Sequence, residues 1–250
     1  MHVVPVPALD PDRFRAILTP AQEEAFEQLI ADGQRALAGR VVWNVNSTAT
    51  GGGVAEMLGP LIGYCRGAGV DTRWVVVDGD PDFFTLTKRI HNRLHGAEGD
   101  GGPLGPEEHA IYERGSARNA APLAELVAAG DIVLLHDPQT AGLVAPMLEA
   151  GAHVIWRCHV GLDAPNEHTH AAWDFLRGYV APAQAYIFSR EAFVWSDLDR
   201  DRIAIIPPSI DAFSPKNQEL DAATVQAILV EAGIVADGDR HPEAVFTRSD

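Results

Sequence analysis

A run of glycines stands where a short apolar strand gives way to a helical pattern, and this segment is well suited to bind an anion. Gly51, Gly52 and Gly53 are consecutive, and Asn46 begins the polar loop that leads to them. Glycines let backbone N–H groups approach a ligand without hindrance from side chains, and the first turn of a helix favours negative charge. A tight turn would need only one glycine, so three in a row indicate contact with a ligand.

Further polar side chains follow the next predicted strands. His136 and Asp137 stand at the end of one strand, and Arg157 and His159 stand at the end of another. Because ligands of an open parallel sheet bind outside the carboxyl ends of its strands, we expect these residues to converge with the glycine loop. A carboxylate can accept hydrogen bonds from sugar hydroxyls, and a cation beside an imidazole suits a phosphate or a hydroxyl. On these residues alone, structural roles such as a turn cap or a salt bridge stay open.

Two other chemistries fit the motifs less well. The glycine loop nearly matches the dinucleotide-binding fingerprint, with Asp78 where a ribose-binding acid would stand, but Glu56 occupies the place of its third glycine or alanine. A nicotinamide-dependent oxidoreductase therefore remains an alternative. Zinc is not expected, because His159, His168 and His170 lack a cysteine pair or an HExxH helix.

The elements that must hold these residues alternate along the chain, which predicts an α/β fold with a doubly wound, Rossmann-like parallel sheet. Apolar runs predict strands at 40–45, 73–77, 131–135, 153–158, 185–188 and 202–206. Helical spacing predicts helices at 20–37, 54–66, 82–95, 106–118, 121–129, 143–149, 171–179 and 222–232. In the helix at 82–95, Phe83, Thr87, Ile90 and Leu94 are expected to face the core.

Composition limits the partners and the compartment. The formal net charge of −16 argues against nucleic acid as a partner, since no basic patch could displace its counterions. Neither a secretory leader nor an apolar run of about eighteen residues is visible, so we expect no membrane association and a cytoplasmic location. The cysteines, Cys65 and Cys158, fall in a predicted helix and strand and are expected to be reduced and packed.

Taken in order, five strings of this sequence resemble the trehalose glycosyltransferring synthases, which are retaining glycosyltransferases with a GT-B fold of two Rossmann domains. The opening string, Asn44 to Leu58, contains the glycine loop, and the resemblance extends over roughly 41–217. The remaining strings lie at 83–92, 136–139, 156–159 and 207–211, with Lys216 and Asn217 after them. The resemblance implies that residues 1–217 form the acceptor-side domain, the N-terminal half of a GT-B fold. Residues 218–250 would form a linker helix and the first strand, at 243–247, of a largely missing C-terminal domain.

The resemblance also implies a reaction and residue roles. Glucose would pass from a nucleoside-diphosphate glucose to an acceptor sugar, with no metal or other cofactor. Gly51, Gly52, Gly53 and Asn46 would lie near the donor, and His159 would act as a catalytic residue beside the transferred sugar. The acceptor sugar would be bound by His136, Asp137, Arg157 and Lys88.

The family's second domain supplies the groups that bind the nucleotide, and this sequence is expected to end before them. We therefore expect a fragment, a truncated product or half of a split enzyme, with weak activity alone and with a homodimer or a separate C-terminal domain as partner. A non-catalytic module that binds carbohydrate or a partner is a further alternative.

Overall fold

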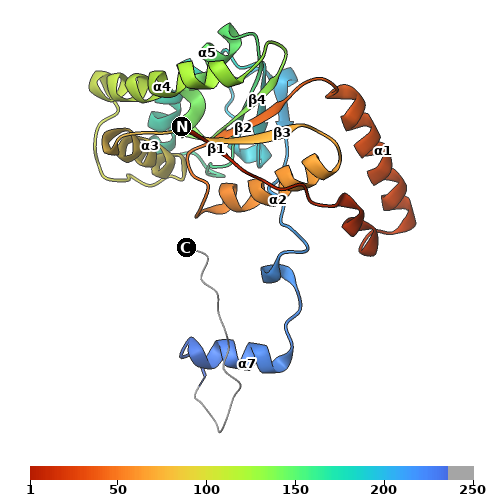
Figure 1. The fold of residues 1–250 in the computed structure, drawn as a ribbon. Helices are drawn as coiled ribbons and strands as arrows, with labels where there is room; N and C mark the ends of the chain where they lie inside the picture. The colour runs from red at the N-terminus through yellow and green to blue at the C-terminus, as the bar shows by residue number, and fades with distance from the viewer. Residues whose placement is uncertain (236–250) are drawn as a thin grey trace. The chain divides into compact units, whose positions relative to one another are not determined.

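The computed structural model describes residues 1–235, and contacts between Cα atoms divide the chain into two units, Met1–Ser209 and a second that begins at Ile210. The strands are β1 (His2–Val4), β2 (Val42–Asn46), β3 (Thr72–Val76), β4 (Ile132–His136), β5 (His153–Cys158), β6 (Ala185–Phe188) and β7 (Ile203–Ile205). The helices are α1 (Pro20–Ala36), α2 (Gly53–Gly67), α3 (Pro81–Leu94), α4 (Pro106–Leu126), α5 (Val144–Glu149), α6 (Glu167–Val180) and α7 (Ala222–Glu231) (Figure 1). The expected strand at 243–247 lies outside the described residues.

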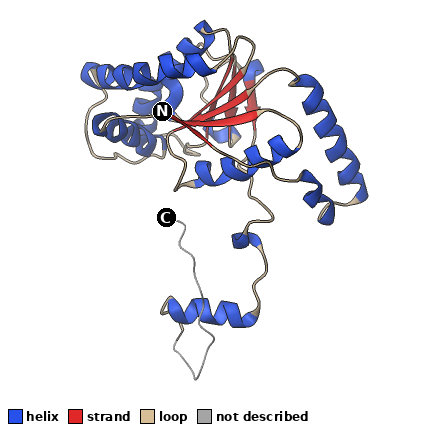
Figure 2. Ribbon diagram, in the orientation of Figure 1, coloured by secondary structure: helices blue, strands red, loops and turns tan. Residues whose placement is uncertain are grey.

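The first unit is built on one seven-stranded sheet with helices on both sides (Figure 2). The strand order is β1-β3-β2-β4-β5-β6-β7, and every neighbouring pair is parallel except β1 with β3. The predicted doubly wound α/β fold is confirmed. Within the described residues, no helix is both long and apolar enough to cross a membrane.

Successive residues of the strands point to opposite faces, and the two faces differ in chemistry. On the apolar face, Val45, Leu135 and Trp156 pack with α3, α4, α5 and α6 in one large hydrophobic cluster. On the polar face, Trp74 and Val76 pack with α2 in a small cluster, and the central strands carry Asn44, His136 and Arg157 among apolar residues. We call these the apolar face and the polar face below.

One prediction of the helices needs correction, and two short elements were not predicted. The helices expected at 106–118 and 121–129 are one helix, α4, which continues through Pro122. Proline removes one helical hydrogen bond, but the next residue, Leu123, is completely buried, and tertiary packing overrides the local preference. The strand β1 and the 3₁₀ segment η1 (Pro11–Ala16) were not predicted; three residues of an edge strand give too short a pattern. The expected core positions Phe83, Thr87, Ile90 and Leu94 are all buried, as predicted.

Candidate functional site

The polar face gathers its side chains on the three central strands, at their carboxyl ends. Asn44 lies on β2, His136 ends β4, and Arg157 is the residue of β5 that pairs with His136 in the sheet. All three are buried, with exposures of 4%, 1% and 6%. Because β4 is the neighbour of both β2 and β5, the sheet itself brings these residues together, as the parallel-sheet argument predicts.

Asn44, His136 and His159 form a continuous line of polar contacts. Oδ1 of Asn44 lies 3.1 Å from Nε2 of His136, and Nδ1 of His136 lies 3.0 Å from Nε2 of His159. The two imidazole rings meet edge to edge, with centroids 5.3 Å apart and planes inclined by 15°. Burial and the nearby Arg157 cation lower the pKa of His159 to about 3, and burial, His159 and Arg157 hold the pKa of His136 well below its usual value. Both rings are therefore neutral at physiological pH.

Asp137 lies in the sharp turn after β4 and uses its backbone and its carboxylate to fix the site. Its Oδ1 accepts a hydrogen bond of 2.7 Å from the backbone N–H of His159, and its carbonyl accepts one of 3.1 Å from the indole of Trp156. Its φ of 63° and ψ of −176° fall in a region that is essentially reserved for glycine. Among the described residues it is the one non-glycine residue with positive φ, and strain of this kind concentrates at functional sites.

Burial also changes the charge of Asp137. It raises the pKa of Asp137 to about 7, although the backbone N–H of His159 and the Arg157 cation act in the opposite direction. A carboxyl group that is half protonated near neutral pH can both donate and accept hydrogen bonds. Its Oδ1 is engaged by His159, which leaves Oδ2 for a ligand.

The turn that carries Asp137 is held from the apolar side of the molecule. It continues into the 3₁₀ segment η2 (Pro138–Leu143), where the Tyr112 hydroxyl of α4 donates to the carbonyl of Pro138 and accepts from the N–H of Gly142. A Cβ on Gly142 would lie 2.1 Å from the hydroxyl oxygen of Ser116, so any other residue there would displace the Ser116 side chain on α4. The strained backbone at Asp137 is therefore held in place by α4.

Arg157 is a buried cation with unused hydrogen-bonding capacity. Its Nε has no hydrogen-bond partner among the described residues, and one terminal nitrogen lies 3.9 Å from the sulfur of Met57 on α2. Burial lowers the pKa of this guanidinium, and the Asp137 carboxylate acts in the opposite direction. Buried polar groups normally have partners, so an unpaired Nε inside this group of polar residues is typical of a functional site rather than of a core.

The glycine loop stands at the start of α2 and is open. Gly51 and Gly52 have φ angles of 72° and 93°, and Gly53 is the first residue of the helix. No atom lies within 4 Å of a Cβ built on any of the three glycines. Asn46 holds the beginning of the loop: its amide accepts from the indole of Trp74 at 2.7 Å and donates to the carbonyl of Thr48 at 2.8 Å.

Lys88 is the predicted site residue that the structure does not bring to this group. It lies exposed on α3, in an open groove with Phe84, Arg89 and Asn92, and no described contact joins it to the polar face. Asn44 is not among the site residues predicted from the sequence, although it is the one amide inside the apolar run 41–45.

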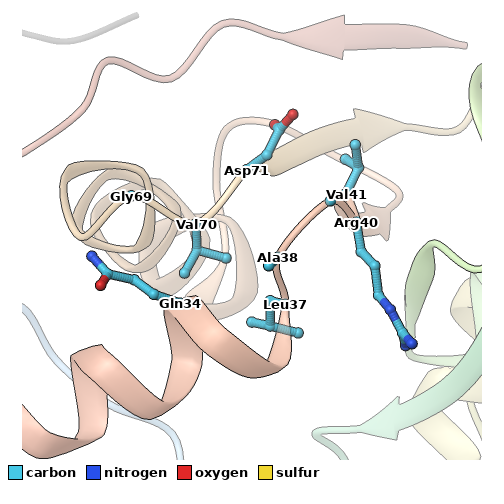
Figure 3. A pocket seen from close by; sticks show the side chains of 9 residues that line it. Gln34, Leu37, Ala38, Arg40, Val41, Gly69, Val70 and Asp71 are labelled. Atoms are coloured by element: carbon cyan, nitrogen blue, oxygen red, sulfur yellow. The ribbon is translucent and has the colours of Figure 1, made fainter.

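A different pocket lies at the opposite edge of the sheet, where β2 and β3 begin. It has a volume of about 320 Å³ and is lined by the end of α1 and by the segments that precede the two strands (Figure 3). Gln34 points toward α2, where its amide donates to the carbonyl of Ala68. The amino ends of parallel strands are not the ligand-binding edge, so this pocket is no rival to the polar face. Within residues 1–235, no group of three or more His, Cys, Asp or Glu side chains is arranged to hold a metal ion.

Comparison with known proteins shows that this chain is similar to the trehalose synthases. A family model described as the N-terminal domain of trehalose synthase matches residues 44–195. The trehalose synthase of Pyrococcus horikoshii is 39% identical over 193 residues, which cover 77% of this chain and 45% of that protein. The trehalose synthase of Rubrobacter xylanophilus is 38% identical over 205 residues, which cover 79% and 48%. The chain thus spans about half the length of the curated relatives that it matches.

More distant similarities agree with the fold. A trehalose phosphorylase of Pleurotus sajor-caju is 28% identical over 191 residues, which cover 70% of this chain and 25% of that protein. Among solved structures, the N-terminal domain of a trehalose-6-phosphate phosphatase from Candida albicans superimposes with a TM-score of 0.53 at 12% identity, covering 78% of this chain and 55% of that chain. At that identity the likeness concerns the fold alone.

Proposed function

Since the chain belongs to the family of trehalose synthase N-terminal domains, we propose that it is the acceptor-side domain of a retaining hexosyltransferase. In this proposal glucose passes from a nucleoside-diphosphate glucose to the anomeric hydroxyl of a second glucose. The observation that carries the proposal is the family match over residues 44–195, which includes the glycine loop and every residue of the polar face described above.

The proposed reaction is a group transfer without oxidation or reduction. The bond between C1 of the donor glucose and the diphosphate oxygen breaks, and a bond forms between C1 and the acceptor oxygen. The diphosphate leaves with the electron pair of the broken bond, and its oxygen takes up the proton that the acceptor hydroxyl loses. The chain's part in this chemistry is to place two sugars in register and to stabilise the charge that develops on the diphosphate.

The residues divide this work by their chemistry. The open loop Gly51–Gly52–Gly53 offers backbone N–H groups and the start of α2 to the diphosphate. His159 and Asp137 offer hydrogen-bonding atoms to sugar hydroxyls, and the buried guanidinium of Arg157 places a positive charge close to both. No metal takes part in the proposed reaction, and a second domain or a second copy of the chain would complete the nucleotide site.

The 28% identity to trehalose phosphorylases supports a second candidate from the same class of chemistry. In that case the glucosyl donor would carry a single phosphate rather than a nucleoside diphosphate. The higher identity to the synthases favours the nucleotide-sugar reaction.

Calorimetric titration of the 250-residue chain tests the sugar site. We expect glucose and trehalose to bind in the millimolar range and His159→Gln to weaken them about tenfold, because one hydrogen bond to a sugar is lost. His153→Gln is the matched control, since His153 is an exposed residue at the other end of β5. Absence of saturable binding, or an equal loss in the control, would contradict the proposal.

The same titrations separate the other candidates. Tighter binding of glucose 1-phosphate than of a nucleoside-diphosphate glucose would favour the phosphorylase reaction. Tight binding of the nucleotide sugar by this chain alone would contradict the assignment of the nucleotide to a second domain. A fluorescence response to a reduced nicotinamide nucleotide would favour the oxidoreductase alternative, since the glycine loop also resembles that fingerprint.

A further inference from the structure

We propose that Asn44 is a positioning residue that fixes the tautomer of His159 through His136, so that Nδ1 of His159 presents a lone pair to a hydroxyl group of the bound sugar. The identity of the ligand rests on the proposed function. The tautomer does not, because it follows from contacts within the chain.

The direction of the hydrogen bonds follows from the atoms that face one another. Oδ1 of Asn44 can only accept, so Nε2 of His136, 3.1 Å away, must carry a hydrogen and donate it. A neutral imidazole has one N–H, so Nδ1 of His136 is then an acceptor. Nε2 of His159, 3.0 Å from that Nδ1, must therefore donate, and the hydrogen of His159 is fixed on Nε2. This leaves Nδ1 of His159 with a lone pair.

This argument needs both rings to be neutral, and their surroundings meet the condition. His136 is 1% exposed, and both rings lie near the guanidinium of Arg157, which disfavours a second positive charge. Burial and Arg157 lower the pKa of His159 to about 3. Asp137, the carboxyl group beside them, accepts from the backbone N–H of His159 rather than from either ring.

His159 is held by its Nε2 and by its backbone. Its Nε2 faces Nδ1 of His136, the two rings meet edge to edge with their planes nearly parallel, and its backbone N–H donates to the Asp137 carboxylate. Nδ1 makes no hydrogen bond within residues 1–235, and His159 is only half-buried. A lone pair held in this way accepts from an O–H or N–H group and repels the oxygens of a phosphate or carboxylate. The geometry therefore selects a hydroxyl-bearing ligand at this point and excludes an anionic one.

Nitrogen NMR of the chain with ¹⁵N-labelled histidine measures the tautomers directly, without any ligand. In His136 and His159 we expect the population of the Nε2–H tautomer to exceed that of the Nδ1–H tautomer by at least about tenfold. This ratio corresponds to the free energy of about one buried hydrogen bond. Loss of the signal in His136→Leu and in His159→Gln assigns each ring. If His159 in the unaltered chain carries its hydrogen on Nδ1, the proposal is wrong, because the amide of Asn44 then faces His136 with its nitrogen.

Removing Asn44 tests its part in the arrangement. In Asn44→Leu we expect the two forms of His136 and His159 to come within about threefold of each other, because nothing then selects Nε2 of His136 as the donor. Asn119→Leu is the matched control: Asn119 is equally buried, at 1% exposure, but bonds to Asp78 and Gly115 instead. An unchanged bias in Asn44→Leu, or an equal loss in the control, would overturn the role of Asn44. If Asn44→Leu does not fold, His136→Leu tests the second step, in which His136 selects Nε2 of His159 as the donor. An unchanged bias of His159 in that variant would overturn the proposal.

Addition of glucose separates this inference from the proposed function. We expect the Nδ1 resonance of His159 to shift with glucose and not with inorganic phosphate. The Nε2–H form without any response to glucose would uphold the tautomer and contradict the sugar contact. A response to glucose from a His159 that carries its hydrogen on Nδ1 would uphold the sugar site and overturn the tautomer.

Discussion

The two faces of the central sheet are built from the same strands but serve different purposes, packing on one face and polar chemistry on the other. On the apolar face, residues such as Val45, Leu135 and Trp156 are completely buried against four helices. On the polar face, the neighbouring residues Asn44, His136 and Arg157 are also buried, but they bond to one another or lack partners. Burial stabilises the fold on the first face, whereas on the second it changes charge and hydrogen-bonding capacity.

The difference teaches that burial alone does not distinguish core from site. Desolvation lowers the pKa of His159 to about 3 and raises the pKa of Asp137 to about 7, so it keeps groups neutral that would be charged in water. Perturbed groups that converge at the ligand-binding edge of a sheet mark a functional site. The predictions below contrast the two faces, beginning with the largest expected effect.

The largest effect is expected on the apolar face, from Leu135→Ala. Leu135 is completely buried between Val45 and Trp156 in the sheet, so its truncation should lower the free energy of unfolding by about 2–5 kcal/mol. Leu134→Ala is the control, since Leu134 is the half-buried neighbour on the polar face and should cost about 1–2 kcal/mol. Urea unfolding measures both, and equal losses would erase the contrast between the faces.

The glycine loop at the start of α2 should show an effect of backbone strain. Gly52, with φ 93° and ψ 153°, has a conformation that other residues avoid, so Gly52→Ala should lower the free energy of unfolding by about 1–3 kcal/mol. Gly53→Ala has open space and lies inside the helix, so it should change stability by less than about 1 kcal/mol, in the stabilising direction. Thermal unfolding of the two variants compares them, and a Gly52→Ala protein as stable as Gly53→Ala would contradict the strain at Gly52.

The pH dependence of stability should reveal the neutral imidazole of His159. The pKa of this ring is about 3 in the folded chain and near 6.5 in the unfolded chain, so between these values the unfolded chain binds the extra proton. The contribution of this group to the free energy of unfolding is therefore full above pH 6.5 and decreases as the pH falls. At pH 5 about 2 kcal/mol of it is lost. His159→Gln should lose correspondingly less between pH 7 and pH 5 in urea titrations, whereas the exposed His153→Gln should keep the slope of the parent chain.

The smallest change in the free energy of unfolding is expected from Arg157→Met, since the Nε of this buried guanidinium has no hydrogen-bond partner among the described residues. Arg157→Met removes a buried guanidinium whose Nε is unpaired, so the free energy of unfolding should change by no more than about 1 kcal/mol, in either direction. Arg89→Met is the contrast, because Asp100 and the carbonyl of Pro103 bind that guanidinium, and we expect a loss of about 1–3 kcal/mol. A loss on Arg157→Met as large as that on Arg89→Met, measured by urea unfolding, would mean that Arg157 serves the fold.

Most of the fold could be predicted because its patterns are long. Each parallel strand is a short apolar run bounded by polar residues, and the predicted strand at 153–158 matches β5 at both ends. The continuous helix α4 could not be foreseen, since Pro122 suits the first turn of a new helix. The structure instead continues one helix through Pro122, with Leu123 completely buried. The predicted fold class and the family resemblance are confirmed by the parallel sheet and by the family match.

The site was predictable only in part. The rule for parallel sheets brought His136, Asp137, Arg157 and His159 to one edge, and the structure confirms that they converge there. The rule does not predict that the side-chain amide of Asn46 is hydrogen-bonded to Trp74 and Thr48, because both contacts depend on the loop conformation. The spacing of residues along α3 also does not show that Lys88 is exposed in a groove that none of the polar-face residues line.

The strained turn at Asp137 has a consequence for how this position can vary. Its backbone conformation suits glycine, while its carboxylate binds the N–H of His159 and faces the ligand edge. A library of all residues at 137, selected for folding alone, should therefore enrich glycine, whereas selection for the proposed sugar binding should retain aspartate. The two selections would differ at a single codon. The difference in the frequencies of glycine and aspartate would measure how much the strained backbone at Asp137 lowers the free energy of unfolding.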